Sequence, residues 1–262
     1  MRSLAFALLI VTCLVGSGAA WSKRQSVAPA TSQTCQETAS ACALNFPSST
    51  AAGSVFWFSM RCGSLEFFNA CQPSSIATYM GMATANGATS CSGSIVDTFT
   101  INTSIELTDD GSSINLATGY VLKSSPTAAS CVLYTRNTTT TDRWYFIVDE
   151  YTPGGEVTVD GTPQGESLPN GSSWTGETLT LTGSNDLQCQ AFTAGVSLEL
   201  YGSFSPASWQ PNEVFIDHLA SSCEMNVSNS TKTTPTLSTS YMEFTGNVNA
   251  MAFKCSGSFC FQ

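Results

Sequence analysis

The stretch Trp144-Tyr145-Phe146-Ile147-Val148 is apolar at every position and shows no alternation. A strand with one wet face alternates apolar and polar residues, whereas a strand inside a sandwich is apolar on both faces. The stretch therefore predicts a central strand that is covered on both sides.

Around this stretch, from residue 99 to residue 200, apolar residues recur at every second position. They fall on one parity in four groups: Phe99, Ile101, Ile105, Leu107; Ile114, Leu116, Tyr120, Leu122; Leu179, Leu181; Val196, Leu198, Leu200. Turn signals lie between the groups: Asp110-Gly111, Pro153-Gly154-Gly155, Asp160-Gly161, Asn170-Gly171, Ala194-Gly195. Period-two patterns separated by such dipeptides are typical of antiparallel sheets, so we expect an all-β middle domain.

Residues 34–83 show a helical pattern instead. Thr34-Cys35-Gln36-Glu37 fits a capping box, the signature of a helix start. Apolar residues then recur at steps of three and four in two stripes that stop at Pro47 and Pro73: Cys35, Ala39, Cys42, Phe46; Val55, Phe58, Cys62, Leu65, Phe68. We expect a cysteine-stapled helical segment over residues 34–90, with Phe56-Trp57-Phe58 in its core.

The chain has 11 cysteines, of which Cys13 lies in an apolar leader. The others follow the leader: Cys35, Cys42, Cys62, Cys71, Cys91, Cys131, Cys189, Cys223, Cys255, Cys260. An even set behind an export signal predicts disulfides formed in an oxidising compartment. On a helical hairpin we favour Cys42 with Cys62 and Cys35 with Cys71.

The leader, residues 1–20, has a positive start, a short apolar run and small residues suited to cleavage. We expect a signal peptide and a secreted, extracellular product. No later stretch is apolar for long enough to span a membrane. Residues 21–33 are expected to form a disordered linker, in which Lys23-Arg24 is either a dibasic processing site or a pair of solvated charges.

Charged residues make up 11% of the chain, and acids exceed bases by 19 to 9. A surface of net charge −10 repels phosphate backbones, which argues against nucleic acid as a partner. N-linked glycans could replace charge as the solubilising layer. The Asn-x-Ser/Thr sites are Asn102, Asn137, Asn170, Asn226 and Asn229.

Residues 91–202 resemble a CUB domain, a β-sandwich module of secreted proteins. The matching pieces occur in order: Cys91-Ser92-Gly93, Gly119-Tyr120, Ser125-Pro126, Cys131-Val132-Leu133-Tyr134, residues 144–151, Glu156-Val157-Thr158-Val159-Asp160-Gly161, residues 179–187 and residues 195–201. The resemblance implies a disulfide between Cys91 and Cys131. It also implies calcium held by acids on neighbouring loops, for which Glu150 and Glu156 are the candidates. Because the loop Thr193-Ala194-Gly195 lacks the remaining acid, we expect no metal site and no cofactor.

Residues 203–262 are expected to form a cysteine-bearing β-extension that gives Cys189 a partner and caps the sandwich. The ending, residues 253–260, also resembles the last cysteine pair of zona-pellucida-type polymerisation domains. A polymerising coat protein is therefore one alternative function.

No catalytic motif is present in the sequence. His218 is the single histidine, and neither Gly-x-Ser-x-Gly nor His-Glu-x-x-His occurs. Asp149 and Glu150 are adjacent on an expected strand and would point to opposite faces. We expect a non-enzymatic protein that binds extracellular protein or glycan through sandwich loops, with Trp174 and Trp209 as exposed contacts. The enzymatic alternative is a carboxylate-based hydrolase, which needs two acids from different strands across an open cleft.

Overall fold

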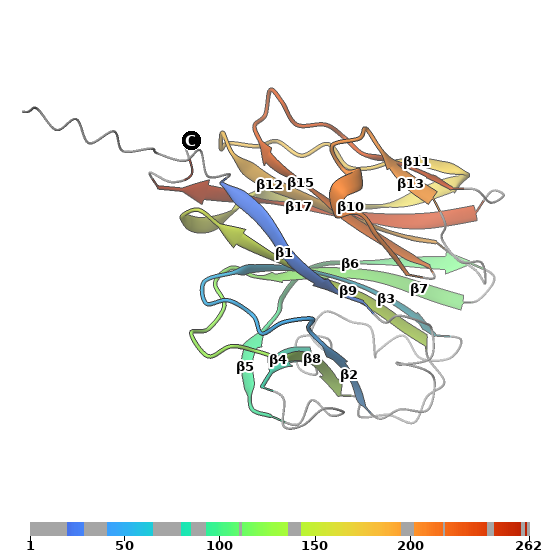
Figure 1. Ribbon diagram of the computed structural model, residues 1–262. Coiled ribbons are helices and arrows are strands. Elements are labelled where there is room, and N and C mark those ends of the chain that lie inside the picture. Colours follow the sequence, from blue (N-terminus) through green and yellow to red (C-terminus); the bar gives the residue numbers. More distant parts are fainter. Residues whose placement is uncertain are drawn as a thin grey trace, which may run out of the picture.

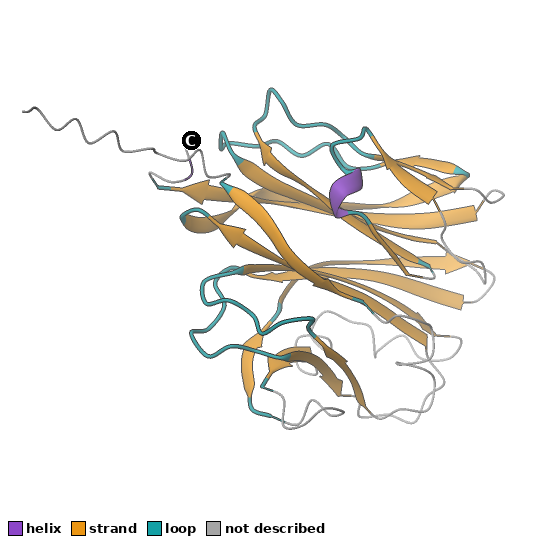
Figure 2. Ribbon diagram, in the orientation of Figure 1, coloured by secondary structure: helices purple, strands orange, loops and turns teal. Residues whose placement is uncertain are grey.

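The computed structural model describes residues 20–28, 41–64, 80–84, 93–109, 112–135, 143–194, 202–216, 218–239, 244–257 and 260. The described residues are mainly β, and all their paired strands are antiparallel (Figures 1 and 2). The predicted β class is therefore confirmed.

Four sheets stack as layers, which we call lower, central, upper and cap (Figure 1). The lower sheet contains, in spatial order, β2 (Ala41–Asn45), β8 (Cys131–Thr135), β4 (Met80–Ala83) and β5 (Ile95–Thr98). The central sheet contains β1 (Trp21–Val27), β9 (Arg143–Pro153), β3 (Val55–Ser64), β7 (Ser112–Val121) and β6 (Thr100–Asp109). The upper sheet contains β10 (Glu156–Gly171), β17 (Phe244–Ser256), β12 (Asp186–Ala194), β15 (Leu219–Val227) and β14 (Val214–Ile216). The cap sheet contains β11 (Ser173–Thr175), β16 (Thr236–Thr239) and β13 (Gly202–Ser205), beside a 3-10 turn at Gln210–Asn212.

Strand β9 has both faces covered, as its sequence predicts. Phe146 and Val148 belong to the core between the lower and central sheets. Tyr145 and Ile147 belong to the core between the central and upper sheets. All four side chains are buried because a layer packs against each face of the central sheet.

The helical prediction is wrong for residues 41–45, 55–64 and 80–83, which form β2, β3 and β4. Strand β3 lies between β9 and β7, and its residues from Val55 to Met60 are all buried. A strand covered on both faces is apolar in a continuous run, so a three- and four-residue spacing can be picked out of it by chance. Phe56-Trp57-Phe58 is in the core as expected, but on a strand.

The predicted helical staples fall largely outside the described residues. Cys35, Cys71 and Cys91 are not among these residues, while Cys42 and Cys62 lie on β2 and β3, in different sheets. The pairings of these five cysteines remain predictions. Cys131 is disulfide-bonded.

The predicted linker is wrong for Trp21–Val27, because these residues form β1 at the edge of the central sheet. Trp21 is only 1% exposed, and its indole Nε1 donates to Asn185 O at 2.8 Å. The segment is ordered because its large side chain packs into the core between the central and upper sheets.

The tail is a β-extension, as predicted: β14, β15 and β17 join the upper sheet, while β13 and β16 join the cap sheet that packs against it. Strand β17 lies between β10 and β12. Cys189 pairs with Cys223 across β12 and β15, and Cys255 pairs with Cys260. The upper and cap sheets therefore each combine strands from the predicted middle domain with strands from the predicted tail.

Two details of the predicted strand pattern differ. Leu179 and Leu181 are buried but lie outside any strand. Gly161, at φ +76°, lies in a register shift within β10 rather than in a turn between two strands. In the part of the chain that is described, no helix has the length and apolar character to cross a membrane.

Candidate functional site

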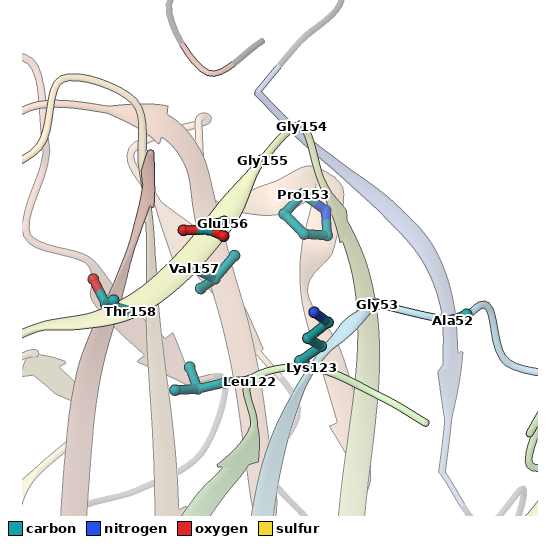
Figure 3. Close-up of a pocket in the computed structure, with 10 residues that line it drawn as sticks. All are labelled: Ala52, Gly53, Leu122, Lys123, Pro153, Gly154, Gly155, Glu156, Val157 and Thr158. Atoms are coloured by element: carbon teal, nitrogen blue, oxygen red, sulfur yellow. The ribbon is translucent and has the colours of Figure 1, made fainter. Parts of the chain in front are cut away.

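A pocket of about 530 Å³ lies where three chain connections meet (Figure 3). One connection precedes β3, one follows β7, and the third carries the chain from β9 in the central sheet to β10 in the upper sheet. The lining residues are Ala52, Gly53, Leu122, Lys123, Pro153, Gly154, Gly155, Glu156, Val157 and Thr158. The pocket is therefore built by these connections together with the end of β9 and the start of β10.

The turn Pro153-Gly154-Gly155 forms one wall of the pocket, and close packing explains Gly155. A Cβ atom on Gly155 would lie 2.2 Å from Ser256 O and 2.7 Å from Cys260 Sγ. A larger residue would push the turn away from the Cys255–Cys260 loop. Gly154 N also donates to Ala20 O at 2.7 Å, so the turn is held from two directions.

Two charged side chains line the pocket, and both are exposed. Lys123 rises from the end of β7 toward Pro153, and Glu156 lies at the start of β10 beside Val157 (Figure 3). Leu122, Pro153 and Val157 supply apolar surface. A cation, an anion and apolar surface on fixed elements can orient a ligand that carries all three features.

The calcium candidates do not meet in this pocket. Glu156 lines it, whereas Glu150 is fully buried in β9. Glu150 Oε1 accepts from Ala51 N at 2.8 Å and Ser54 Oγ at 2.7 Å, and Oε2 accepts from Gln25 Nε2. Protein donors therefore hold the Glu150 carboxylate. Among the described residues, no group of three or more potential metal ligands comes together.

A second cluster pairs the Lys23-Arg24 dipeptide with buried acids. Lys23 Nζ lies 3.1 Å from Asp149 Oδ1, and Arg24 Nε lies 3.3 Å from Glu150 Oε2. Lys23 is half-buried and is not a solvated charge, whereas Arg24 is exposed and keeps contact with solvent. Burial raises the pKa of Asp149, although the positive charge of Lys23 and the Ser26 hydroxyl act in the opposite direction.

Burial also raises the pKa of Tyr151 well above its usual value, and the negative charge of Asp149 adds to the rise. The Tyr151 hydroxyl makes no hydrogen bond to any described residue. The Asp149 and Tyr151 side chains therefore sit in a closed interior that solvent does not reach.

A third cluster is a carboxyl pair formed by Asp160 on β10 and Asp186 on β12. Their side chains share a hydrogen bond, and both are buried. Burial, the hydrogen bond with Asp160 and the charge of Asp160 raise the pKa of Asp186 to about 7. Burial acts to raise the pKa of Asp160 too, but hydrogen bonds from Thr182, Asp186 and Gly183 outweigh it and leave that pKa lowered.

This pair does not have the geometry of a glycosidase. The two carboxyl groups share one hydrogen bond and are buried under the Thr182-Gly183 segment, whereas hydrolysis needs them roughly 5–9 Å apart across an open cleft. His218 is also buried, with its ring 5.7 Å from the Tyr145 ring. The adjacent acids Asp149 and Glu150 bind different partners, as their opposite directions on a strand require.

The expected aromatic contacts are wrong. Trp174 is 2% exposed and Trp209 is fully buried, and both pack between the upper and cap sheets. Their indole nitrogens bond to Pro169 O and Thr233 Oγ1. Turn-rich sequence around a tryptophan does not place it at the surface when a further sheet covers the turn.

Sequence reasoning located the turn at Pro153-Gly154-Gly155 but missed Lys123 and the pocket. The pocket depends on three connections that are distant in the chain, and no local pattern reports their proximity. Comparison with family models, with curated proteins and with solved structures finds no match. The CUB resemblance therefore stays a prediction.

Proposed function

We propose that the chain is a secreted, glycosylated, non-enzymatic binding protein whose pocket holds an extended segment of another extracellular protein. The observation that carries the proposal is the pocket at the three chain connections, with Lys123 and Glu156 beside apolar surface. Disulfides at Cys189–Cys223 and Cys255–Cys260 support an oxidising compartment.

A peptide fits this lining better than a sugar does. None of the ten lining residues is aromatic, so the pocket offers no ring for a sugar to stack on. Elsewhere on the described surface, the large hydrophobic residue that is exposed is Ile95, which has no aromatic ring either. An extended peptide places alternate side chains on one side, about 6.6–6.8 Å apart. An acidic and a basic side chain flanking an apolar one would match Lys123, Glu156 and the apolar surface.

The experiment pans a display library of seven-residue peptides against the folded, disulfide-bonded chain. We expect enriched peptides to carry an acid and a base around an apolar residue. Lys123→Glu and Glu156→Lys should each weaken their binding tenfold or more, since each variant places like charges together. The double variant should select peptides with the two charges exchanged.

Lys232→Glu is the matched control, because it makes the same charge change outside the pocket lining. It should leave the affinity for the enriched peptides within about twofold of that of the natural chain. Absence of enrichment, or enrichment that both pocket variants leave unchanged, contradicts the proposal. A glycan array is run in parallel. A signal on it that is lost in Lys123→Glu would show that the pocket binds a glycan instead of a peptide.

A further inference from the structure

Four of the Asn-x-Ser/Thr sites lie in the described part of the chain, and they differ in where their side-chain amides point. Asn137 lies outside it. An N-linked glycan is attached to Nδ2, so a glycosylated asparagine in the folded chain needs an Nδ2 atom that faces solvent.

Asn102 directs its amide into the protein. It is the bulged residue of β6, at the register shift between Ile101 and Thr103. Its Nδ2 donates to Met251 Sδ, and Met251 is 1% exposed in the core between the central and upper sheets. A sugar on this nitrogen would have to replace Met251 and separate β6 from β17.

Asn226 is exposed like Asn170 and Asn229, but it differs from them in using its amide to hold β1. Its Oδ1 accepts from Trp21 N at 2.9 Å, and its Nδ2 donates to Trp21 O at 3.5 Å. Both contacts are made by one edge of the planar amide, the edge that carries Oδ1 and the Nδ2 hydrogen on the same side as Oδ1. A glycosylated amide is secondary and adopts the trans form, so the sugar takes the place of that N–H. The glycan would point at the Trp21 carbonyl, against a strand whose tryptophan is buried.

Asn170 and Asn229 present their amides to solvent. Both residues are exposed. Asn229 Oδ1 accepts from Leu181 N at 3.3 Å and from Lys232 Nζ at 2.7 Å, and no bond to a described residue uses its Nδ2. The Asn170 side chain makes no hydrogen bond within the described structure. A sugar at either position displaces no core contact.

We propose that N-linked glycans occupy Asn170 and Asn229, whereas Asn102 and Asn226 carry none. The inference rests on the proposed secretion. The donor is a lipid-linked oligosaccharide diphosphate. In the transfer, Nδ2 forms a bond to C1 of the first sugar and loses a proton to a base of the transferase. The bond from C1 to the diphosphate breaks, and the lipid diphosphate leaves.

The test secretes the full chain from a eukaryotic cell and releases its glycans with an amidase that converts each glycosylated Asn to Asp. Peptide mass mapping should find Asp at positions 170 and 229 and Asn at positions 102 and 226. Asn170→Gln and Asn229→Gln should each remove one glycan from the intact mass. Asn102→Gln and Asn226→Gln, the matched controls, should leave the glycan number unchanged.

A glycan on Asn102 or Asn226 of the folded, secreted chain would overturn the inference. So would a secreted chain with Asn170 and Asn229 unmodified. Neither result affects peptide binding by the pocket, which is measured separately. Failure of the leader to direct secretion contradicts the proposed function instead, so the two failures are distinguishable.

Discussion

At the scale of the residue, Asp186 makes stability depend on pH. Its pKa is about 7 in the folded protein, compared with an ordinary value of 3.8. Between these values the unfolded chain releases the proton while the folded chain keeps it. The stabilisation is full below about pH 4 and is lost as pH rises through about 7.

Asp186→Asn should abolish this pH dependence, because an amide donates to Asp160 at every pH. We expect the variant to match the natural chain near pH 4 and to exceed it at pH 8 by on the order of 2–4 kcal/mol. Chemical denaturation at the two pH values measures the difference.

Asp160→Asn is the matched control for the carboxyl pair. Asp160 accepts from Thr182 N at 2.6 Å and from the Thr182 hydroxyl, so its replacement removes an acceptor from the segment. It should lower stability at both pH values. Equal pH dependence in the natural chain and in Asp186→Asn would contradict the shared proton.

At the scale of the element, β1 brings counter-charges to β9. Asp149 and Glu150 are both fully buried, and Lys23 and Arg24 both come from the edge strand β1. A register shift between Lys23 and Gln25 sets the two basic residues at the places where they reach these acids. Strand β1 therefore supplies the positive charges that pair with the buried acids of β9, and it also forms the edge of the central sheet.

Lys23→Ala should cost about 3–5 kcal/mol near neutral pH, since it leaves a buried carboxylate without its cation. The cost should shrink in acid, where Asp149 takes up a proton. The double variant Lys23→Ala/Asp149→Asn should recover much of the loss. Thermal unfolding across pH checks this, with Lys232→Ala expected to change stability by no more than about 0.5 kcal/mol. A loss in Lys23→Ala that acid does not reduce would contradict the charge-pair explanation.

Elements differ in how well sequence predicts them. Strand β9 was predictable because aromatic and β-branched residues filled every position of Trp144 to Val148. Strand β3 was not, because the capping signal at Thr34 and the spacing of Val55, Phe58 and Cys62 suggested helix. A strand that is buried on both faces has few polar positions. Without them, the two-residue period of a strand cannot be distinguished from the three- and four-residue spacing of a helix.

At the scale of the whole molecule, the two described cysteine pairs close loops of very different length. Cys189–Cys223 spans 34 residues, and Cys255–Cys260 spans 5. A disulfide stabilises the folded protein by restricting the unfolded chain, and the effect grows with loop length. The expected stabilisation is about 4 kcal/mol for the first loop and about 2 kcal/mol for the second. Overall stability should therefore depend more on the longer link.

Cys189→Ala/Cys223→Ala should lower the free energy of unfolding by about twice as much as Cys255→Ala/Cys260→Ala. The shorter link should matter more for peptide binding, because Cys260 packs against Gly155 in the pocket wall. Denaturant titration and peptide affinity, measured on both double variants, separate the two roles. The same ranking of the variants in both measurements would contradict this division.

The candidate site shows where sequence reasoning stops. The turn at Pro153-Gly154-Gly155 was visible in the sequence, and so were Glu156 and the glycosylation sites. Lys123 had no signal, because its role follows from where β7 ends relative to β10. Positions within one connection can be predicted, whereas their convergence depends on the order of strands in two sheets.

Strand β17 lies in the interior of the upper sheet, between β10 and β12, although it is the last described strand in the chain. During synthesis the ribosome delivers β10 and β12 first, and the space between them stays empty until residues 244–256 emerge. Both strands then expose unpaired backbone edges to other nascent chains. We therefore expect the newly made chain to depend on chaperones until translation reaches this strand. A stop codon before residue 244 should produce an aggregating product rather than a shorter folded one.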